Sequence, residues 1–191
     1  MSFLTVYADH ADYQQEAPLV DTQDASAIQA YLAEHGIDFT RWQASQPVHA
    51  DATQAEILAA YDQEVQALKQ AQGFTTADVI HLTSAHPEKQ ALRQKFLAEH
   101  IHSEDEVRFF VSGRGLFCLH LEGKVALVGC ERHDLISVPA SAKHWFDMGA
   151  EPEFTCVRLF TNPEGWVAQF TGDKIAEKFP RFEQVAAKFA S

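Results

Sequence analysis

Apolar residues follow two different periods along this chain, and the change of period divides the chain into three parts. The first part mixes strand-like and helical patterns, and its clearest helix is predicted over 52–72, where apolar residues recur every 3.6 positions. The middle part is a series of short apolar runs between glycine-containing turns, which predicts β-strands. The last part predicts two helices, over 168–179 and 182–190, separated by Pro180.

The remaining predicted elements are short. Helices are predicted over 25–35, with Asp24 as the N-cap, and over 87–96. The glycines at 113–115 and 122–124 predict hairpin turns. Strands are predicted over 3–7, 39–42, 78–82, 107–111, 116–121, 124–129, 135–138 and 154–160. Regularly spaced short strands indicate a mainly β fold with flanking helices, either a barrel or a double-sheet jelly roll.

Three histidines and one glutamate in the middle part have the residue types and spacing of a metal site. His100 and His102 are two positions apart, so both rings leave the same face of a strand. Glu106 keeps this parity if the strand resumes in phase, and His144 follows after enough residues for several more strands. Imidazole suits Zn, Cu, Fe and Ni. A closed zinc site usually contains cysteine, and no cysteine adjoins these residues, so an open Fe, Ni or Mn site is favoured.

Two arginines in the apolar strands need a partner, because a buried guanidinium stays charged. Arg108 has the parity of the metal-site residues, so it could neutralise an anionic substrate or hold a carboxylate. Arg158 could do the same, or it could lie on an outer face and pair with a surface acid. Glu99, Asp105 and Asp147 could accept hydrogen bonds from ligand imidazoles. A solvated acidic loop is the alternative interpretation of Asp105.

Length and composition limit the class of protein. The 191 residues suit a single domain, with N-terminal α/β elements over 1–75, a β-barrel over about 76–165 and C-terminal helices over about 166–191. The aromatic fraction of 11% includes 14 phenylalanines, which favours a β-rich core or an apolar pocket. A formal charge of −12 argues against nucleic acid or an anionic membrane as a partner.

The cysteines and the N-terminus indicate a cytoplasmic protein. The three cysteines are widely spaced, contain no CxxC pair and lie in apolar stretches, so they are expected to be buried thiols. The first ten residues lack the basic region and long apolar run of a secretory signal. No window reaches the roughly 18 apolar residues that a membrane helix needs.

The spacing of the metal-site residues resembles the two motifs of the cupin superfamily. The residues that carry this match are His100, His102, Glu106 and Gly113 for the first motif, and Pro139, Ser141 and His144 for the second. The second motif usually has glycine where Ser141 stands. More narrowly, segments 99–102, 105–109, 144–147, 154–160 and 165–166 resemble the acireductone dioxygenase family, and the match is specific from about residue 75 to 170.

The resemblance implies a cupin-type barrel and a monomeric dioxygenase of methionine salvage. It implies Fe(II) or Ni(II) bound by His100, His102, Glu106 and His144, with O₂ and 1,2-dihydroxy-3-keto-5-methylthiopentene as substrates. The Fe(II) form would give 4-methylthio-2-oxobutanoate and formate. The Ni(II) form would give 3-methylthiopropionate, formate and CO.

The resemblance also places five side chains around the substrate. Arg108 and Arg158 would bind it, and Phe96, Phe146 and Trp166 would line its pocket, although ordinary core packing also explains the aromatic residues. Two other functions stay open. One is a different small-molecule metal cupin enzyme, and the other is a non-catalytic, ligand-binding cupin.

Overall fold

One long strand, β6 (Glu106–Leu121), organises the fold because its two halves belong to two different sheets. Its first half pairs with β8 (Asp134–Val138) and β10 (Phe154–Phe160). Its second half pairs with β7 (Lys124–Glu131) and β9 (Lys143–Asp147). All four pairings are antiparallel, so β6 is the strand that joins the two sheets of a jelly-roll-like sandwich.

The computed structural model describes residues 1–162 and 167–190. The first sheet has the order β4-β10-β6-β8-β3, with β4 at Thr76–Leu82 and β3 at Asp38–Arg41. The second has the order β11-β5-β9-β6-β7-β1-β2. Its remaining strands are β11 (Gln169–Phe170), β5 (His100–Ile101), β1 (Phe3–Ala8) and β2 (Val20–Thr22). The mainly β fold with flanking helices is therefore confirmed.

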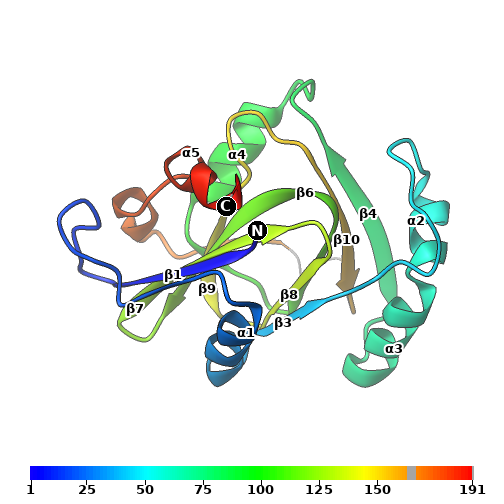
Figure 1. Cartoon of the computed structure of the whole chain (residues 1–191), viewed down its shortest axis with the longest axis horizontal. Coiled ribbons are helices and arrows are strands. Elements are labelled where there is room, and N and C mark those ends of the chain that lie inside the picture. The colour runs from blue at the N-terminus through cyan, green and yellow to red at the C-terminus, as the bar shows by residue number, and fades with distance from the viewer. Residues whose placement is uncertain (163–166, 191) are drawn as a thin grey trace.

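Apolar side chains fill the space between the sheets and cover their outer faces. The inner cluster includes Phe110, Phe117 and Phe146, with α1 (Ala25–Glu34) at one end. The outer face of the first sheet is covered by α2 (Gln54–Ala60) and α3 (Asp62–Gln72), seen beyond β4 in Figure 1. The C-terminal tail covers the second sheet. No helix among residues 1–162 and 167–190 is long and apolar enough to cross a membrane.

The predicted hairpin at 113–115 is wrong, because β6 continues through these residues and bends between the sheets. Gly113 has φ 75°, and a Cβ there would lie 1.8 Å from the Glu153 carbonyl oxygen. The β6–β10 register shifts between Thr155 and Cys156, as expected for a β-bulge at a bend. Glycine is therefore needed here because the backbone is left-handed and the neighbouring strand lies too close for a Cβ, and not because the chain reverses. The predicted turn at 122–124 is a genuine hairpin between β6 and β7.

The predicted helix over 52–72 is two helices, since Tyr61 interrupts it. Tyr61 has φ −117° and is fully buried, with its ring 4.6 Å from that of Phe109. The helix is therefore interrupted where the Tyr61 ring packs against the sheet, although the apolar period continues through this position. The predicted end at Gly73 is confirmed, with φ 78°. The N-cap at Asp24 is also confirmed, because its carboxylate accepts a hydrogen bond from the Ala27 N–H at 2.7 Å.

The C-terminal tail is less helical than its apolar pattern predicts. Residues 168–179 hold β11 and a 3₁₀ turn over Ile175–Lys178, and residues 182–190 hold α5 (Phe182–Val185) followed by a 3₁₀ turn over Ala186–Ala190. The apolar side chains of the tail pack on the outer face of the second sheet around Trp145. Their spacing therefore follows that surface and not a helical period. The predicted helix near 87–96 is confirmed as α4 (Lys89–Leu97).

Candidate metal centre

Strand pairing brings the three predicted histidines and the glutamate together in the protein interior. His100 on β5 lies directly opposite His144 on β9, and Glu106 begins β6. The four residues have exposed fractions between 1% and 7%. One potential ligand atom from each lies within 4.8 Å of all the others. His144 Nε2 lies 2.7 Å and His102 Nε2 3.4 Å from the same Glu106 oxygen, so the four side chains converge on one point.

Two of the imidazoles are oriented by backbone carbonyls. His100 Nδ1 donates to the Ala98 carbonyl at 2.7 Å, and His144 Nδ1 donates to the Ala142 carbonyl at 2.9 Å. In each case the acceptor lies two residues before the histidine, and the bond turns Nε2 toward the cluster. Burial, together with the neighbouring His144, lowers the pKa of His100 to about 4. The ring is therefore neutral near pH 7, as a metal ligand must be.

The Glu106 carboxylate is charged despite its burial. Burial alone would raise its pKa, but the Arg108 guanidinium and the hydrogen bonds from His102 and His144 hold that pKa well below its usual range. Arg108 Nε donates to Glu106 Oε1 at 2.7 Å, which leaves Oε2 facing the imidazoles. Three imidazoles and one carboxylate oxygen are therefore available to a divalent ion.

A tight turn places His144, and Ser141 explains its shape. Ser141 has φ 65°, the left-handed conformation that favours glycine, which stands at this place in the usual cupin motif. The Ser141 N–H donates to the His102 carbonyl at 2.9 Å, so this turn is tied directly to the other ligand segment. Asp105 helps, since its carboxylate accepts the Ala140 N–H at 2.8 Å. The structure thus places Asp105 on the turn and not on a ligand imidazole.

Arg108 lies beside the cluster among aromatic rings. Its guanidinium carbon is 5.0 Å from the ring centre of Phe146, 5.7 Å from that of Phe117 and 5.9 Å from that of Phe96. The predicted residues Phe96 and Phe146 therefore both border Arg108, with their own ring centres 6.4 Å apart. Trp166, which the family resemblance also points to, lies outside the described residues.

Arg158 shares a row of cross-strand partners with Arg108. Asp78, Arg158 and Arg108 occupy matching positions on β4, β10 and β6, and we call these three residues the arginine row. Arg158 donates two hydrogen bonds to Asp78, at 2.8 and 2.6 Å, and both side chains are more than a quarter exposed. This arrangement combines the two sequence-based alternatives: Arg158 faces the side that Arg108 faces, and it pairs with a partly exposed acid.

Two other predicted acids have partners outside the ligand set. The Glu99 carboxylate accepts hydrogen bonds from His120 Nδ1 at 2.5 Å and from the Thr171 hydroxyl at 2.7 Å. The Asp147 carboxylate accepts two from Arg93, at 2.8 and 3.0 Å. Glu99 and Asp147 were expected to accept hydrogen bonds from ligand imidazoles. For His100 and His144, the acceptors are instead the backbone carbonyls of Ala98 and Ala142.

Neither Arg93 nor His120 was identified as a candidate from the sequence. His120 lacks a partner motif nearby in the sequence, since its partner Glu99 comes from another strand region. Arg93 did carry one signal, because it precedes Phe96 by three residues on a predicted helix and therefore shares its face.

A two-sheet jelly-roll-like fold with a buried cluster of three histidines and a glutamate defines a metal-binding protein of the cupin type. The model of the ARD/ARD' family matches residues 4–168 of this chain. The acireductone dioxygenase of Hahella chejuensis is 63% identical over 185 residues, a match that covers 97% of this chain and 98% of that protein. The chain belongs to the ARD/ARD' family.

Two further comparisons agree. The acireductone dioxygenase of Pseudomonas aeruginosa is 57% identical over 183 residues, covering 96% of this chain and 99% of that protein. A solved structure of the acireductone dioxygenase from Bacillus anthracis, with a cadmium ion in its active centre, is similar with a TM-score of 0.76 at 29% sequence identity. That match covers 89% of this chain and 98% of the solved one, so the fold is shared over almost the whole length.

Proposed function

We propose that this chain is an acireductone dioxygenase of methionine salvage, which cleaves 1,2-dihydroxy-3-keto-5-methylthiopentene with O₂. The observation that carries the proposal is the buried convergence of His100, His102, Glu106 and His144 in a member of the ARD/ARD' family. Acireductone dioxygenases more than 55% identical over nearly the full length of this chain support it.

Fe(II) or Ni(II) would be held by these four side chains. Their chemistry suits either ion, because imidazole nitrogen and carboxylate oxygen are common ligands of both. When bound, the ion would act as a Lewis acid on the enediol oxygens of the substrate. The chain's own contribution is imidazoles turned inward by the carbonyls of Ala98 and Ala142, and a charged Glu106.

Arg108 would bind the anionic part of the substrate. It is buried beside Glu106, where a fixed positive charge interacts strongly because water is excluded. Phe96 and Phe146 would keep water from this region and contact the apolar methylthioethyl tail, together with Trp166. Arg158, held by Asp78, would extend the positive face that Arg108 begins.

We further propose that the chain works as a cytoplasmic monomer built from one cupin domain, with 1–75 and about 166–191 packed around a barrel over about 76–165. Antiparallel strands from all three parts share the same sheets, which supports a single domain, and all three cysteines are buried free thiols, which supports a reducing compartment. The formal charge of −12 supports a small-molecule substrate rather than nucleic acid or an anionic membrane as the partner, and the monomeric state is what the family resemblance implies.

The test is reconstitution of metal-free protein with Fe(II) or Ni(II), followed by product identification. We expect one ion per chain, 4-methylthio-2-oxobutanoate and formate from the Fe(II) form, and 3-methylthiopropionate, formate and CO from the Ni(II) form. Metal-loaded protein that leaves the acireductone unchanged would contradict the proposal. It would favour another metal cupin enzyme, or a ligand-binding cupin if no open coordination position is found.

A further inference from the structure

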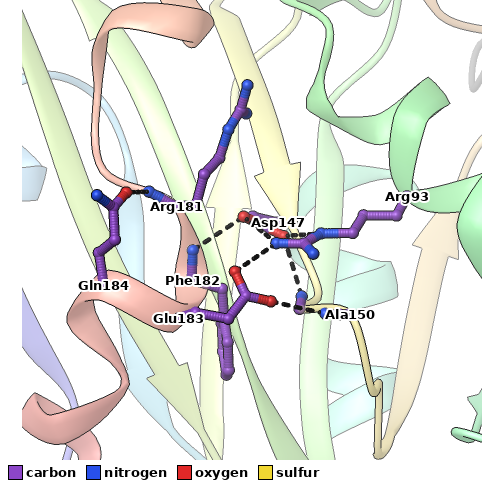
Figure 2. A network of polar contacts seen from close by, with 8 residues as sticks. Arg93, Asp147, Ala150, Arg181, Phe182, Glu183 and Gln184 are labelled. Carbon is purple, nitrogen blue, oxygen red and sulfur yellow. Dashed lines mark hydrogen bonds and ion pairs between the residues drawn. The ribbon is translucent and has the colours of Figure 1, made fainter.

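A network of charged side chains joins three separate parts of the chain at the end of β9 (Figure 2). Asp147 is 1% exposed, and its carboxylate accepts four hydrogen bonds: two from Arg93 and one each from the N–H groups of Gly149 and Phe182. Arg93 also donates to Glu183 at 2.7 Å. The network thus ties α4 to the end of β9 and to the C-terminal tail.

The charges in this network are firmly held. Although burial opposes its protonation, hydrogen bonds to Asp147 and Glu183 raise the pKa of Arg93 above its ordinary value. Arg93 is only 16% exposed and binds Asp147 through two parallel hydrogen bonds. Such forked, shielded pairs are stronger and more directional than surface ion pairs.

Helix α4 depends on this network because apolar burial holds it only weakly. No residue of α4 (Lys89–Leu97) is fully buried, and its apolar contacts come from partly buried side chains, including Phe96. Arg93 lies three residues before Phe96, so both side chains leave the same face of the helix. The position of the Phe96 ring is therefore set by where Arg93 anchors the helix.

Phe146, the ring whose centre is nearest the Arg108 guanidinium among the three phenylalanine rings around it, is held differently. Its ring lies over Gly115 of β6, where an added Cβ would come within 2.4 Å of Cζ. It also packs against Phe117 and Phe154, with ring centres 4.8 and 5.8 Å away. The aromatic wall beside Arg108 therefore has one side fixed by the sheet, at Phe146, and one side fixed through α4, at Phe96.

We propose that Arg93, Asp147 and Glu183 form a clamp that positions Phe96 against Arg108 and so sets the width of the apolar site for the substrate tail. This inference rests on the proposed function, because the tail belongs to the acireductone. The three clamp residues act through Phe96 and are positioning residues. Their removal should weaken recognition of the tail and leave metal binding intact.

The same helix offers a matched control. Lys89 of α4 forms a 2.6 Å ion pair with Glu151, in the segment that follows β9, and Glu151 is 69% exposed. Lys89→Gln and Arg93→Gln each remove one positive charge from α4 and break its bond to the β9 side. Only Arg93→Gln breaks the buried clamp.

The first measurement compares KM and kcat for the methylthio acireductone and for an analogue whose tail is a single methyl group. For Arg93→Gln we expect KM for the tailed substrate to rise about tenfold, the scale of a misfitted apolar pocket. We expect the methyl analogue, kcat and metal stoichiometry to stay near wild type. For Arg93→Lys we expect a KM for the tailed substrate between those of wild type and Arg93→Gln, because lysine keeps the positive charge but cannot form the two parallel hydrogen bonds of the guanidinium. Lys89→Gln should match wild type with both substrates.

Equal effects of Arg93→Gln on both substrates, loss of metal, or no effect at all would overturn the clamp. The second measurement is hydrogen–deuterium exchange of residues 89–99, which needs no activity. We expect faster exchange through Phe96 in Arg93→Gln than in Lys89→Gln, and unchanged exchange would also overturn the clamp. If wild-type protein consumes neither acireductone, the proposed function fails and the exchange result alone decides whether Arg93 holds α4.

Discussion

Arg108 and Arg158 stand opposite each other on paired strands, yet they lie in different surroundings. Arg108 is 6% exposed, bonds to Glu106 and is surrounded by three phenylalanine rings. Arg158, one strand away, is more than a quarter exposed and bonds to Asp78. The two arginines have paired strand positions and face the same side of the sheet. They differ in how deeply each guanidinium is buried and in which carboxylate it binds.

The difference shows where along the arginine row a charge can act on a bound anion. The energy between two charges rises as water is excluded, so the same guanidinium counts for more at Arg108 than at Arg158. Arg108 also has a charged neighbour in the ligand set, whereas the Asp78 partner of Arg158 lies at the outer strand of the sheet. We therefore expect functional effects to fall steeply from the metal cluster to Arg108 and then to Arg158.

The largest effect is expected from His144→Ala, at the buried end of this gradient. The variant removes one of four ligands and the imidazole that lies 2.7 Å from Glu106 Oε2, so bound metal and turnover should both be lost. The melting temperature should fall as well, because metal that binds only the folded state stabilises it. Metal analysis, activity and thermal unfolding check this, with the exposed His10→Ala as control. Full metal occupancy and normal turnover in His144→Ala would refute the ligand assignment.

Arg108→Ala should come next. We expect it to keep its metal and lose about 2–4 kcal/mol of transition-state stabilisation, the scale of removing one preorganised donor. Arg108→Lys should recover little of this, because a lysine cannot reproduce the planar fork. Measuring kcat/KM beside metal content separates the roles. A variant that is inactive only because its metal is gone would make Arg108 a support for Glu106 instead of a substrate-binding residue.

Arg158→Ala should have a smaller effect, about tenfold or less in kcat/KM, because solvent screens a partly exposed charge. Asp78→Asn should act in the same direction, and the double variant should cost less than the sum of the two, since the residues share one ion pair. Arg132→Ala, at an exposed position, serves as control. An effect of Arg158→Ala as large as that of Arg108→Ala would break the comparison.

The smallest effect is expected at Cys156, two residues from Arg158 on β10. Burial raises the pKa of this thiol to about 12, so it is protonated and covered near neutral pH. Iodoacetamide at pH 8 should leave the native protein essentially unlabelled, as Cys118 and Cys130 are buried too. Arg158→Cys should add one labelled site. Rapid labelling of Cys156 would show that solvent reaches deeper along β10 than its burial indicates.

The sequence predicted the metal cluster well because its members obey local rules. His100 and His102 needed only strand parity, and the downstream turn motif located His144. Gly113 was misjudged because a left-handed glycine suits a hairpin and a bent strand equally. The tail was misjudged because its apolar residues fit the surface around Trp145. Partners such as Arg93 and Asp147, or Glu99 and His120, meet only through tertiary packing, so no local pattern could pair them.

The long strand β6 also has a consequence for how the protein is made. All four strands that pair with it, β7, β8, β9 and β10, follow it in the chain. A ribosome delivers the N-terminal segments first, so β6 must wait for each partner in turn. Until β10 emerges, one edge of its first half stays open to pairing with another chain. Nascent chains that stop before Phe154 should therefore be the most aggregation-prone intermediates of synthesis, and they would carry all four metal-binding side chains without the sheet that completes their surroundings.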